Sequence, residues 1–349
     1  MPAGVIDVLI RGAGPVGCVA ALALRESHQV RVLESGAASP AFRPIVLSYA
    51  SRLILERVGA WDALAATAID TIHVSQAGAF GRTVLSAADA GVPALGYVVE
   101  YAELLASLRK PLAGLLTPEE LPARCVVHAE GMSPDAEVKR YAQDALVAMV
   151  EMSPPARSMA FERFTREGPL ALLPFAGRYA LVWSLPQEKA QALAAAPPGE
   201  FLRALNAAAG TRPGRALGVE ARAVQPISLR VRAARIGERS VYIGNAAQTL
   251  HPVAGQGLNL GLRDAWELAR IMRSAPDPGD GASLARFAAR RRLDAGATIR
   301  ATDVLAGIFL GVNPLAAVAR GAALTALDIF PAPRRFFARR MIFGPSALP

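Results

Sequence analysis

A glycine-rich loop near the amino terminus restricts the fold of this chain more than any other feature. Residues 5–10 are apolar apart from Asp7 and rich in β-branched side chains, which predicts a buried parallel strand. The loop at 12–17 reads Gly-Ala-Gly-Pro-Val-Gly. An alanine- and leucine-rich segment at 18–26 predicts a helix, and residues 30–33 predict a second strand. We therefore expect a strand–helix–strand unit at the start of an α/β domain.

The loop has the G-x-G-x-x-G spacing of Rossmann-like dinucleotide-binding sites. Gly12 permits a tight turn, Gly14 lets the backbone approach a pyrophosphate, and Gly17 allows the helix to pack closely on the strand. Glu34 follows the second strand, where its carboxylate would accept hydrogen bonds from the hydroxyls of an adenosine ribose. The alternative, a glycine-rich turn in an α/β protein that binds nothing, does not account for an acid at this position.

The composition permits a large core and argues against nucleic acid as a partner. The chain has 349 residues, enough for about two domains, and 52% of them are apolar. The net charge is +9, but the basic residues are spread widely, without a stripe interleaved with aromatics or a zinc-finger spacing. We expect no nucleic-acid interface. The charge fits a solvated arginine-rich surface, an anionic cofactor or an anionic membrane surface.

The cysteines and the apolar segments indicate a cytoplasmic protein. Cys18 and Cys125 are not in a C-x-x-C pair, so we interpret both as structural and predict no metal site. The first residues lack the pattern of a signal peptide. The longest apolar stretch, 304–319, is interrupted by Asn313-Pro314 and is shorter than the about 20 residues of a membrane span.

The middle of the chain, from about 140 to 235, changes to short strand-like runs that predict a mostly antiparallel sheet. A buried strand returns at 240–243 and a long helix follows at 258–273. We therefore predict two domains, one inserted in the other. The dinucleotide-binding domain, with C-terminal helices, comprises residues 1–70, 97–135 and 238–349, and the inserted substrate domain comprises residues 71–96 and 136–237.

A second motif occupies residues 244–264 and begins Gly-Asn-Ala-Ala-Gln-Thr-Leu-His-Pro-Val-Ala-Gly-Gln-Gly. It combines the end of a strand, a polar turn and a glycine-rich entry to a helix. Such an entry presents unpaired N–H groups and the positive end of the helix dipole, which would stabilise the negative charge of a reduced flavin. The alternative is a long structural loop that caps a helix, which explains the glycines but not the whole string.

This string resembles the second FAD motif of the aromatic-ring hydroxylases, also called group A flavoprotein monooxygenases. Within that superfamily the chain resembles the bacterial 2-polyprenyl-6-methoxyphenol hydroxylases of ubiquinone biosynthesis. Three further stretches agree, at residues 43–49, 160–174 and 290–294. The resemblance covers nearly the whole chain. It implies an FAD-binding Rossmann-like domain of the para-hydroxybenzoate-hydroxylase type, with an inserted antiparallel-sheet substrate domain and C-terminal helices.

The resemblance also implies roles for single residues. Arg43 would lie near the flavin or its pyrophosphate, and Asn245 would bind the ribityl chain in place of the usual Asp. Pro252 would border the flavin. The full set implied to bind the cofactor is Gly12, Gly14, Gly17, Glu34, Arg43, Gly244, Asn245, Gly255, Gln256, Gly257 and Asn259.

His251 is the histidine within this second motif. It would orient the substrate or relay a proton from a phenol, together with Pro252 as the candidate catalytic pair. The alternative is a turn histidine bonded to the backbone. We interpret His28, His73 and His128 as surface or packing residues.

Two departures from the family pattern concern the dinucleotide site. Glu130 stands where the family has Asp before a glycine. The segment 111–124 is short, where family members carry extra strands beside the adenine. We therefore expect the adenine side of the site to be less complete than in the family.

The implied reaction is hydroxylation of a prenylated phenol with O2, with NADPH or NADH as a transient reductant. Alternatives are another aromatic substrate, or a non-catalytic FAD-fold subunit that scaffolds other ubiquinone-biosynthesis proteins. A plain NAD dehydrogenase leaves residues 244–264 without a role. Arginines and aromatics alternate at 334–343, which predicts either peripheral contact with the inner membrane or a helix packed on the domain.

Overall fold

A computed structural model of the chain describes residues 4–34, 43–131, 136–249, 256–292, 296 and 314–344. Within these residues the strands form three sheets. The first has the order β15-β16-β9-β1-β2-β8. Its strands are β1 (Ile6–Arg11), β2 (Val30–Leu33), β8 (Leu116–Thr117), β9 (Ala123–His128), β15 (Ile236–Gly237) and β16 (Ser240–Tyr242).

Most of this sheet is parallel, and β1 lies at its centre. β1 pairs in parallel with β2 on one side and with β9 on the other, and β9 pairs in parallel with β16. The carboxyl ends of these strands therefore meet at one edge. The order of the strands reverses at β1, and open α/β sheets bind ligands in the crevice at such a point.

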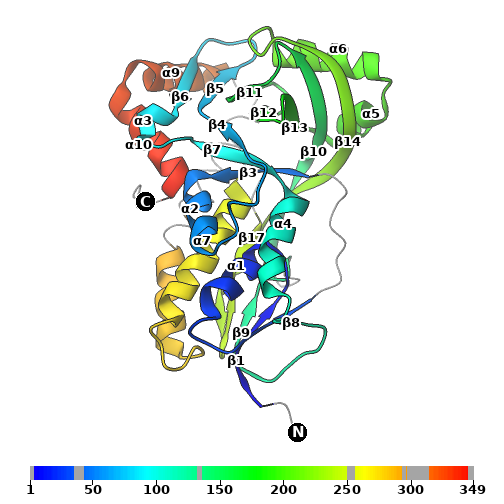
Figure 1. Ribbon diagram of the computed structural model, residues 1–349. Helices are drawn as coiled ribbons and strands as arrows, with labels where there is room; N and C mark the ends of the chain where they lie inside the picture. The colour runs from blue at the N-terminus through cyan, green and yellow to red at the C-terminus, as the bar shows by residue number, and fades with distance from the viewer. Residues whose placement is uncertain are drawn as a thin grey trace.

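Helices cover the parallel sheet and share one core with it (Figure 1). They are α1 (Pro15–Leu24), α2 (Tyr49–Arg57), α4 (Tyr101–Arg109) and α7 (Gln256–Met272), with short 3-10 turns η1 (Lys110–Leu112) and η2 (Gly244–Ala246). Nine of the ten residues of α1 are buried. The small side chains of this helix allow it to lie closely between β1 and α7. It begins three residues before the predicted start, because Pro15 is suited to the first helical position.

The second sheet has the order β17-β14-β10-β13-β12-β11-β5-β6 and is antiparallel except where β5 meets β11. Its strands are β5 (Thr71–Gln76), β6 (Arg82–Ser86), β10 (Glu137–Ser153), β11 (Met159–Phe164), β12 (Pro169–Phe175), β13 (Arg178–Pro186), β14 (Arg215–Val231) and β17 (Gln248–Thr249). The helices α5 (Gln187–Ala195) and α6 (Pro198–Ala209) cover its outer face, at the upper right of Figure 1.

The predicted antiparallel sheet is thus present, but two of its strands escaped prediction. β14 is exposed or half-buried at 15 of its 17 positions, so its apolar alternation is weak. β11 contains Glu162 and Arg163 in succession, which interrupts the pattern of a buried strand. The predicted division of the chain into two domains stays a prediction.

A small third sheet lies between the two large ones. It consists of β3 (Pro44–Ser48), β4 (Thr67–Ile69) and β7 (Gly96–Glu100) in antiparallel pairing. β3 contacts α7, and β7 contacts β12, so this sheet joins the two halves. The segment 47–58, predicted as one helix, is the end of β3 followed by α2. The helix begins after Ser48, whose hydroxyl accepts a hydrogen bond from the Ser51 N–H at 3.2 Å.

The C-terminal part is helical where the structure describes it, as predicted. Residues 281–292 are helical, and α9 (Pro314–Ile329) and α10 (Pro331–Phe343) follow. α10 packs on the short helix α3 (Ala87–Ala90), with Ala338, Ile342 and Phe343 buried between them. Across the described ranges, no helix combines the length and the apolarity needed to cross a membrane.

Candidate functional site

The glycine loop follows β1 and packs against the end of β9. Gly12 has φ +106°, and a Cβ there would lie 2.6 Å from the Glu130 Cα. A Cβ at Gly17 would collide with the carbonyl oxygen of Gly12. Both positions therefore require glycine, Gly12 because of its backbone angle and its neighbour, and Gly17 because helix α1 touches the turn that precedes it.

Gly14 differs from the other two glycines because its α-hydrogen faces open space. No atom lies within 4 Å of a Cβ built at this position. Gly14 is the N-cap of α1 and has no side-chain cap, so the first amides of this helix have no intrahelical partner. Open space beside unpaired amides at a helix N-terminus suits a pyrophosphate.

Glu34 lies at the carboxyl end of β2, as predicted, and forms an ion pair with Arg109 at the end of α4. Its backbone N–H donates to the Thr117 carbonyl at 3.0 Å, which joins β2 to β8. The short segment after α4 thus adds a strand of two residues beside the position expected for adenosine. Arg109 is a functional neighbour that the sequence did not indicate, since it is 75 positions away from Glu34.

Gly244 follows β16 and connects the second motif to the glycine loop. It has φ +57°, and a Cβ there would lie 3.1 Å from the side chain of Val16 in α1. Its N–H donates to Oδ2 of Asp264 at 3.1 Å. The motif therefore lies directly beside the first turn of α1, and both predicted halves of the site meet at one edge of the parallel sheet.

Asp264 is fully buried and holds this turn together. Its carboxylate accepts a hydrogen bond from Nε of Arg291 at 2.6 Å and another from Nε2 of Gln248 at 2.9 Å, and Arg235 lies 3.5 Å away. Burial works to raise the pKa of Asp264, but the two guanidinium groups outweigh it and the pKa is lowered. The acid is therefore charged and structural.

The structure describes only part of the remaining second motif. Asn245 is exposed beside the turn, and Gln256 and Gly257 begin α7. Among the residues that the structure describes, none lies within 4 Å of a Cβ built at Gly257. His251, Pro252 and Gly255 lie outside the described residues.

Asn259 is buried, and its side chain bonds to protein groups. Its Oδ1 accepts hydrogen bonds from the Ser48 N–H at 2.8 Å and the Ser51 hydroxyl at 2.7 Å, and its Nδ2 donates to the Val46 carbonyl at 2.9 Å. These bonds fasten the β3–α2 junction to α7. The side chain of Asn259 is therefore engaged within the protein, so a contact of this residue with a cofactor would come from its backbone.

Arg43 is exposed at the start of β3. Its backbone N–H donates to Oε1 of Glu100 at 2.9 Å, and its guanidinium carbon lies 5.2 Å from the centre of the Tyr101 ring. The pairing of β3 with β7 thus places Arg43 beside the start of α4, where the Tyr101 N–H donates to its carbonyl at 3.0 Å.

His128, predicted as an ordinary packing residue, belongs to a stack at the end of β9. Its ring lies 4.3 Å from that of Tyr242 at an interplanar angle of 8°, and its Nδ1 lies 2.9 Å from Oε1 of Glu130. Burial works to raise the pKa of Glu130, but the hydrogen bonds and the charge of His128 lower it overall. Glu130, which stands where the family has the shorter Asp, is thus bonded to His128.

Glu162 is a candidate that sequence reasoning did not single out. It lies on β11 opposite Val74 of β5 and Ala171 of β12. Ala160, two positions earlier, packs with Ile69 and Val98 on the sheet face that turns toward the small sheet, and alternation places Glu162 on the same face. Burial raises the pKa of Glu162 to about 8. An acidic residue within a strand that is otherwise apolar apart from Arg163 was the available signal.

The sequence comparisons identify the family of this dinucleotide site. The profile of the FAD binding domain family matches residues 119–302, just over half of the 349 residues. The chain belongs to this family. The ubiquinone hydroxylase UbiL of Rhodospirillum rubrum is 31% identical over 96% of this chain and 89% of its own length. The 3-demethoxyubiquinol 3-hydroxylase of Escherichia coli is 26% identical over 82% of this chain and 86% of its own length.

A solved structure supports the same fold. HpxO of Klebsiella pneumoniae, in complex with FAD and uric acid, has a TM-score of 0.76 at 17% identity and covers 97% of this chain and 98% of that chain. The chain is thus an FAD-dependent monooxygenase of the ubiquinone-biosynthesis type. Its residues fit the cofactor, because the described residues leave open space beside Gly14 at α1 and beside Gly257 at α7.

Proposed function

We propose that this monooxygenase hydroxylates the aromatic ring of a polyprenylated phenol in ubiquinone biosynthesis, with NADPH or NADH as reductant and O2 as the oxygen source. The observation that carries this proposal is the similarity to a ubiquinone hydroxylase over 96% of the chain. The second relative, a demethoxyubiquinol hydroxylase, also acts on a ring of this class by its name.

We propose that the chain binds FAD along the edge where the parallel strands end. The bound FAD supplies the redox chemistry, taking electrons from the reductant and activating O2. The unpaired amides at the start of α1 hold the pyrophosphate beside Gly14, and Glu34 binds the adenosine ribose. Asn245 binds the ribityl chain, and the first turn of α7, including Gln256 and Gly257, faces the pyrimidine edge of the flavin.

We propose that Glu162 positions the phenol. Its pKa of about 8 keeps the carboxyl protonated at neutral pH, and it then donates a hydrogen bond to the substrate oxygen. The apolar side chains on the neighbouring strands, Val74 and Ala171, suit the ring and tail of a prenylated phenol. His251 and Pro252 stay the candidates on the flavin side of the ring.

The test is anaerobic reduction of the FAD-loaded protein by NADPH or NADH, followed by flavin absorbance, with and without a prenylated phenol. We expect reduction that is faster with the phenol present, and a hydroxylated product after air is admitted. Glu162→Leu is expected to raise the KM for the phenol about tenfold and leave FAD content unchanged, since the hydrogen-bond donor to the substrate is lost. Absence of reduction under every condition would overturn the proposal, and turnover of other aromatics alone would overturn the substrate.

We also propose peripheral contact with the cytoplasmic face of the inner membrane through α9 and α10. In α10, Arg334 donates a hydrogen bond to the Asp89 carboxylate and Arg339 donates one to the Ala90 carbonyl. These two arginines therefore hold α10 against α3. Ile329, Phe330 and Phe336 stay more than half exposed and form the apolar part of the surface. Such a surface suits a bilayer interface. Phe330→Ser with Phe336→Ser is expected to reduce co-sedimentation with vesicles of anionic lipid, and equal co-sedimentation would contradict the contact.

A further inference from the structure

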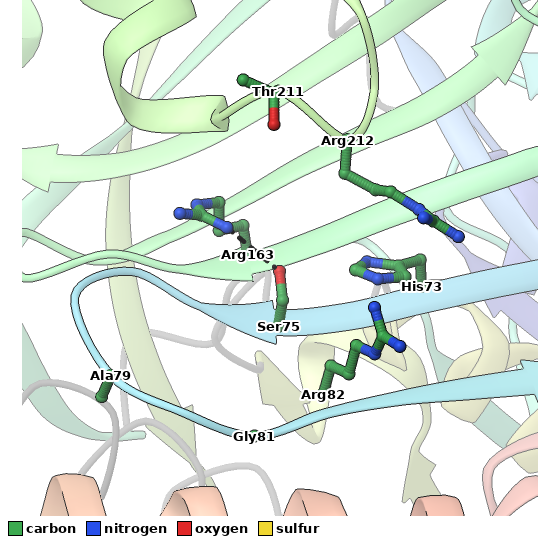
Figure 2. Close-up of a pocket in the computed structure, with 8 residues that line it drawn as sticks. All are labelled: His73, Ser75, Ala79, Gly81, Arg82, Arg163, Thr211 and Arg212. Carbon is green, nitrogen blue, oxygen red and sulfur yellow. Dashed lines mark hydrogen bonds between the residues drawn. The ribbon is translucent and has the colours of Figure 1, made fainter.

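A pocket of about 430 Å³ lies on the eight-stranded sheet. It is formed by the β5–β6 hairpin, β11 and the loop that follows α6 (Figure 2). The residues that line it are His73, Ser75, Ala79, Gly81, Arg82, Arg163, Thr211 and Arg212. It is an unassigned cavity, and its lining is dominated by cationic side chains.

The pocket opens on the outer face of the sheet, which α5 and α6 cover. Phe161 packs with Phe201 of α6 on this face, and the His73 ring lies 5.9 Å from that of Phe161. Arg163 follows Phe161 by two positions and pairs in register with Ser75, so both belong to the same face. Glu162 and the proposed phenol site belong to the opposite face. The sheet therefore separates the pocket from the flavin.

Three guanidinium groups meet in this pocket without a carboxylate among the described lining residues. In Figure 2 the side chains of Arg82 and Arg212 approach His73 from opposite sides. Arg163 lies deeper, where its Nη1 is 3.5 Å from the Ser75 hydroxyl and its buried Nε has no hydrogen-bond partner. Three like charges at close range raise the free energy of the empty pocket, and a bound anion reverses this.

Two residues beside the three arginines, His73 and Gly210, are compatible with this positive charge. His73 is buried, and its burial together with the charge of Arg212 lowers its pKa, so the imidazole is neutral. Gly210 ends α6 with φ +72°, and a Cβ there would lie 3.2 Å from the guanidinium carbon of Arg163. The end of α6 thus lies against Arg163 and fixes the direction of its donors.

We propose that this pocket binds the phosphate group of a phosphomonoester or diphosphate. The planar forks of Arg82, Arg163 and Arg212 match the oxygens of a multiply charged phosphate. The hydroxyls of Ser75 and Thr211 supply further donors. The pocket has a volume of about 430 Å³, whereas one water molecule takes about 30 Å³ in the liquid. A diphosphate together with part of its organic group therefore fits.

The phosphate has two chemical sources, a water-soluble ester and a lipid headgroup. Phe80 lies in the hairpin between the lining residues Ala79 and Gly81, and its side chain is 55% exposed. An exposed aromatic residue at the rim of an anion site places apolar surface where acyl chains of a lipid would begin. Both sources are therefore included in the test. The site does not depend on the proposed hydroxylation, because the sheet lies between the two.

The soluble arm titrates the FAD-loaded protein with sodium pyrophosphate in a calorimeter. We expect saturable binding that Arg212→Gln and Arg163→Gln each weaken about 10- to 100-fold, as for the loss of one charge-assisted hydrogen bond. Arg203→Gln is the matched control, since this arginine of α6 is 79% exposed and removes the same charge outside the pocket. Thermal unfolding of each variant shows that it is folded, and the flavin spectrum is expected to stay unchanged on binding.

The lipid arm measures co-sedimentation with phosphatidylcholine vesicles that contain phosphatidic acid, against vesicles of phosphatidylcholine alone. Binding to phosphatidic acid that is lost in Arg212→Gln but kept in Arg203→Gln supports the lipid source. Pyrophosphate binding with the same dependence, and no such vesicle binding, supports the soluble source. If neither ligand binds, or if Arg203→Gln weakens binding as much as the pocket variants, the proposal is overturned.

Discussion

The buried carboxylate of Asp264 accepts a hydrogen bond from the backbone N–H of Gly244 at 3.1 Å. The two residues are 20 positions apart, one in α7 and the other in the turn after β16. The same carboxylate bonds to Arg291 at 2.6 Å. The turn that is proposed to hold the ribityl chain is therefore positioned by a buried charged group that bonds to its first residue, Gly244.

Asp264→Asn is expected to destabilise the fold by about 3–5 kcal/mol, because Arg291 and Arg235 lose the charge that compensates them in a buried place. Urea unfolding measures the loss. Asp62→Asn removes an exposed carboxylate and serves as the control, with an expected change below about 0.5 kcal/mol. Equal effects of the two substitutions would contradict the structural role.

The stability due to Asp264 is expected to depend on pH at the acid end. Burial raises the pKa of this carboxyl, but Arg291 and Arg235 outweigh it and the folded pKa lies below the unfolded value of about 3.9. The stabilisation is therefore present above about pH 4 and is lost as the pH falls through the folded pKa. In urea titrations, the difference in stability between the parent and Asp264→Asn should shrink as the pH falls below about 4. A constant difference would show that the charge of Asp264 is irrelevant.

Gly14→Ala and Gly17→Ala are expected to separate binding from folding. A Cβ at Gly17 collides with the backbone of Gly12, so this variant should lose about 1–3 kcal/mol of stability as well as FAD. A Cβ at Gly14 meets no protein atom, so this variant should keep its unfolding midpoint without FAD and bind FAD at least tenfold more weakly. Thermal unfolding and fluorescence titration with FAD measure the two effects. Full FAD affinity of Gly14→Ala would exclude the pyrophosphate from this position.

Glu162→Gln is expected to stabilise the protein in alkaline solution. Burial raises the folded pKa to about 8, above the unfolded value of about 4.3, so stability due to this carboxyl falls as the pH rises between the two values. The variant should match the parent at pH 4 and exceed it by about 1–3 kcal/mol at pH 9, since Glu162 keeps partial contact with water. Parallel stability curves of the two proteins would mean that the carboxyl titrates normally.

Glu34→Gln and Arg109→Gln are expected to affect FAD binding unequally. Glu34→Gln removes the charged acceptor for the ribose and should weaken FAD binding about tenfold. Arg109 forms a half-exposed ion pair, so its substitution should change stability by less than about 1 kcal/mol and FAD affinity by less than threefold. Fluorescence titration decides this, and a larger effect of Arg109→Gln would assign the arginine to the cofactor.

Local patterns predicted much of the fold. The strand–loop–helix–strand unit at residues 5–34 and the helix Tyr101–Arg109 are present where they were expected. The long strand β14 was missed because most of its side chains are exposed or half-buried, so no strict alternation marks it. The end of β3 was missed because only its last two residues, Leu47 and Ser48, lie in this segment, which is too short for an alternating pattern.

The glycine loop could be predicted from sequence alone, because the positive φ of Gly12 and the contact of Gly17 with the Gly12 carbonyl both arise within the loop and the first turn of α1. Tertiary structure alone decided what surrounds it. Arg109 reaches Glu34, and Arg235 and Arg291 reach Asp264, from segments that carry no local signal for these contacts. The same holds for the phosphate pocket, since strand pairing brings together arginines from the β5–β6 hairpin, β11 and the loop after α6. Contacts between distant segments depend on how sheets and helices pack, and spacing along the chain does not record them.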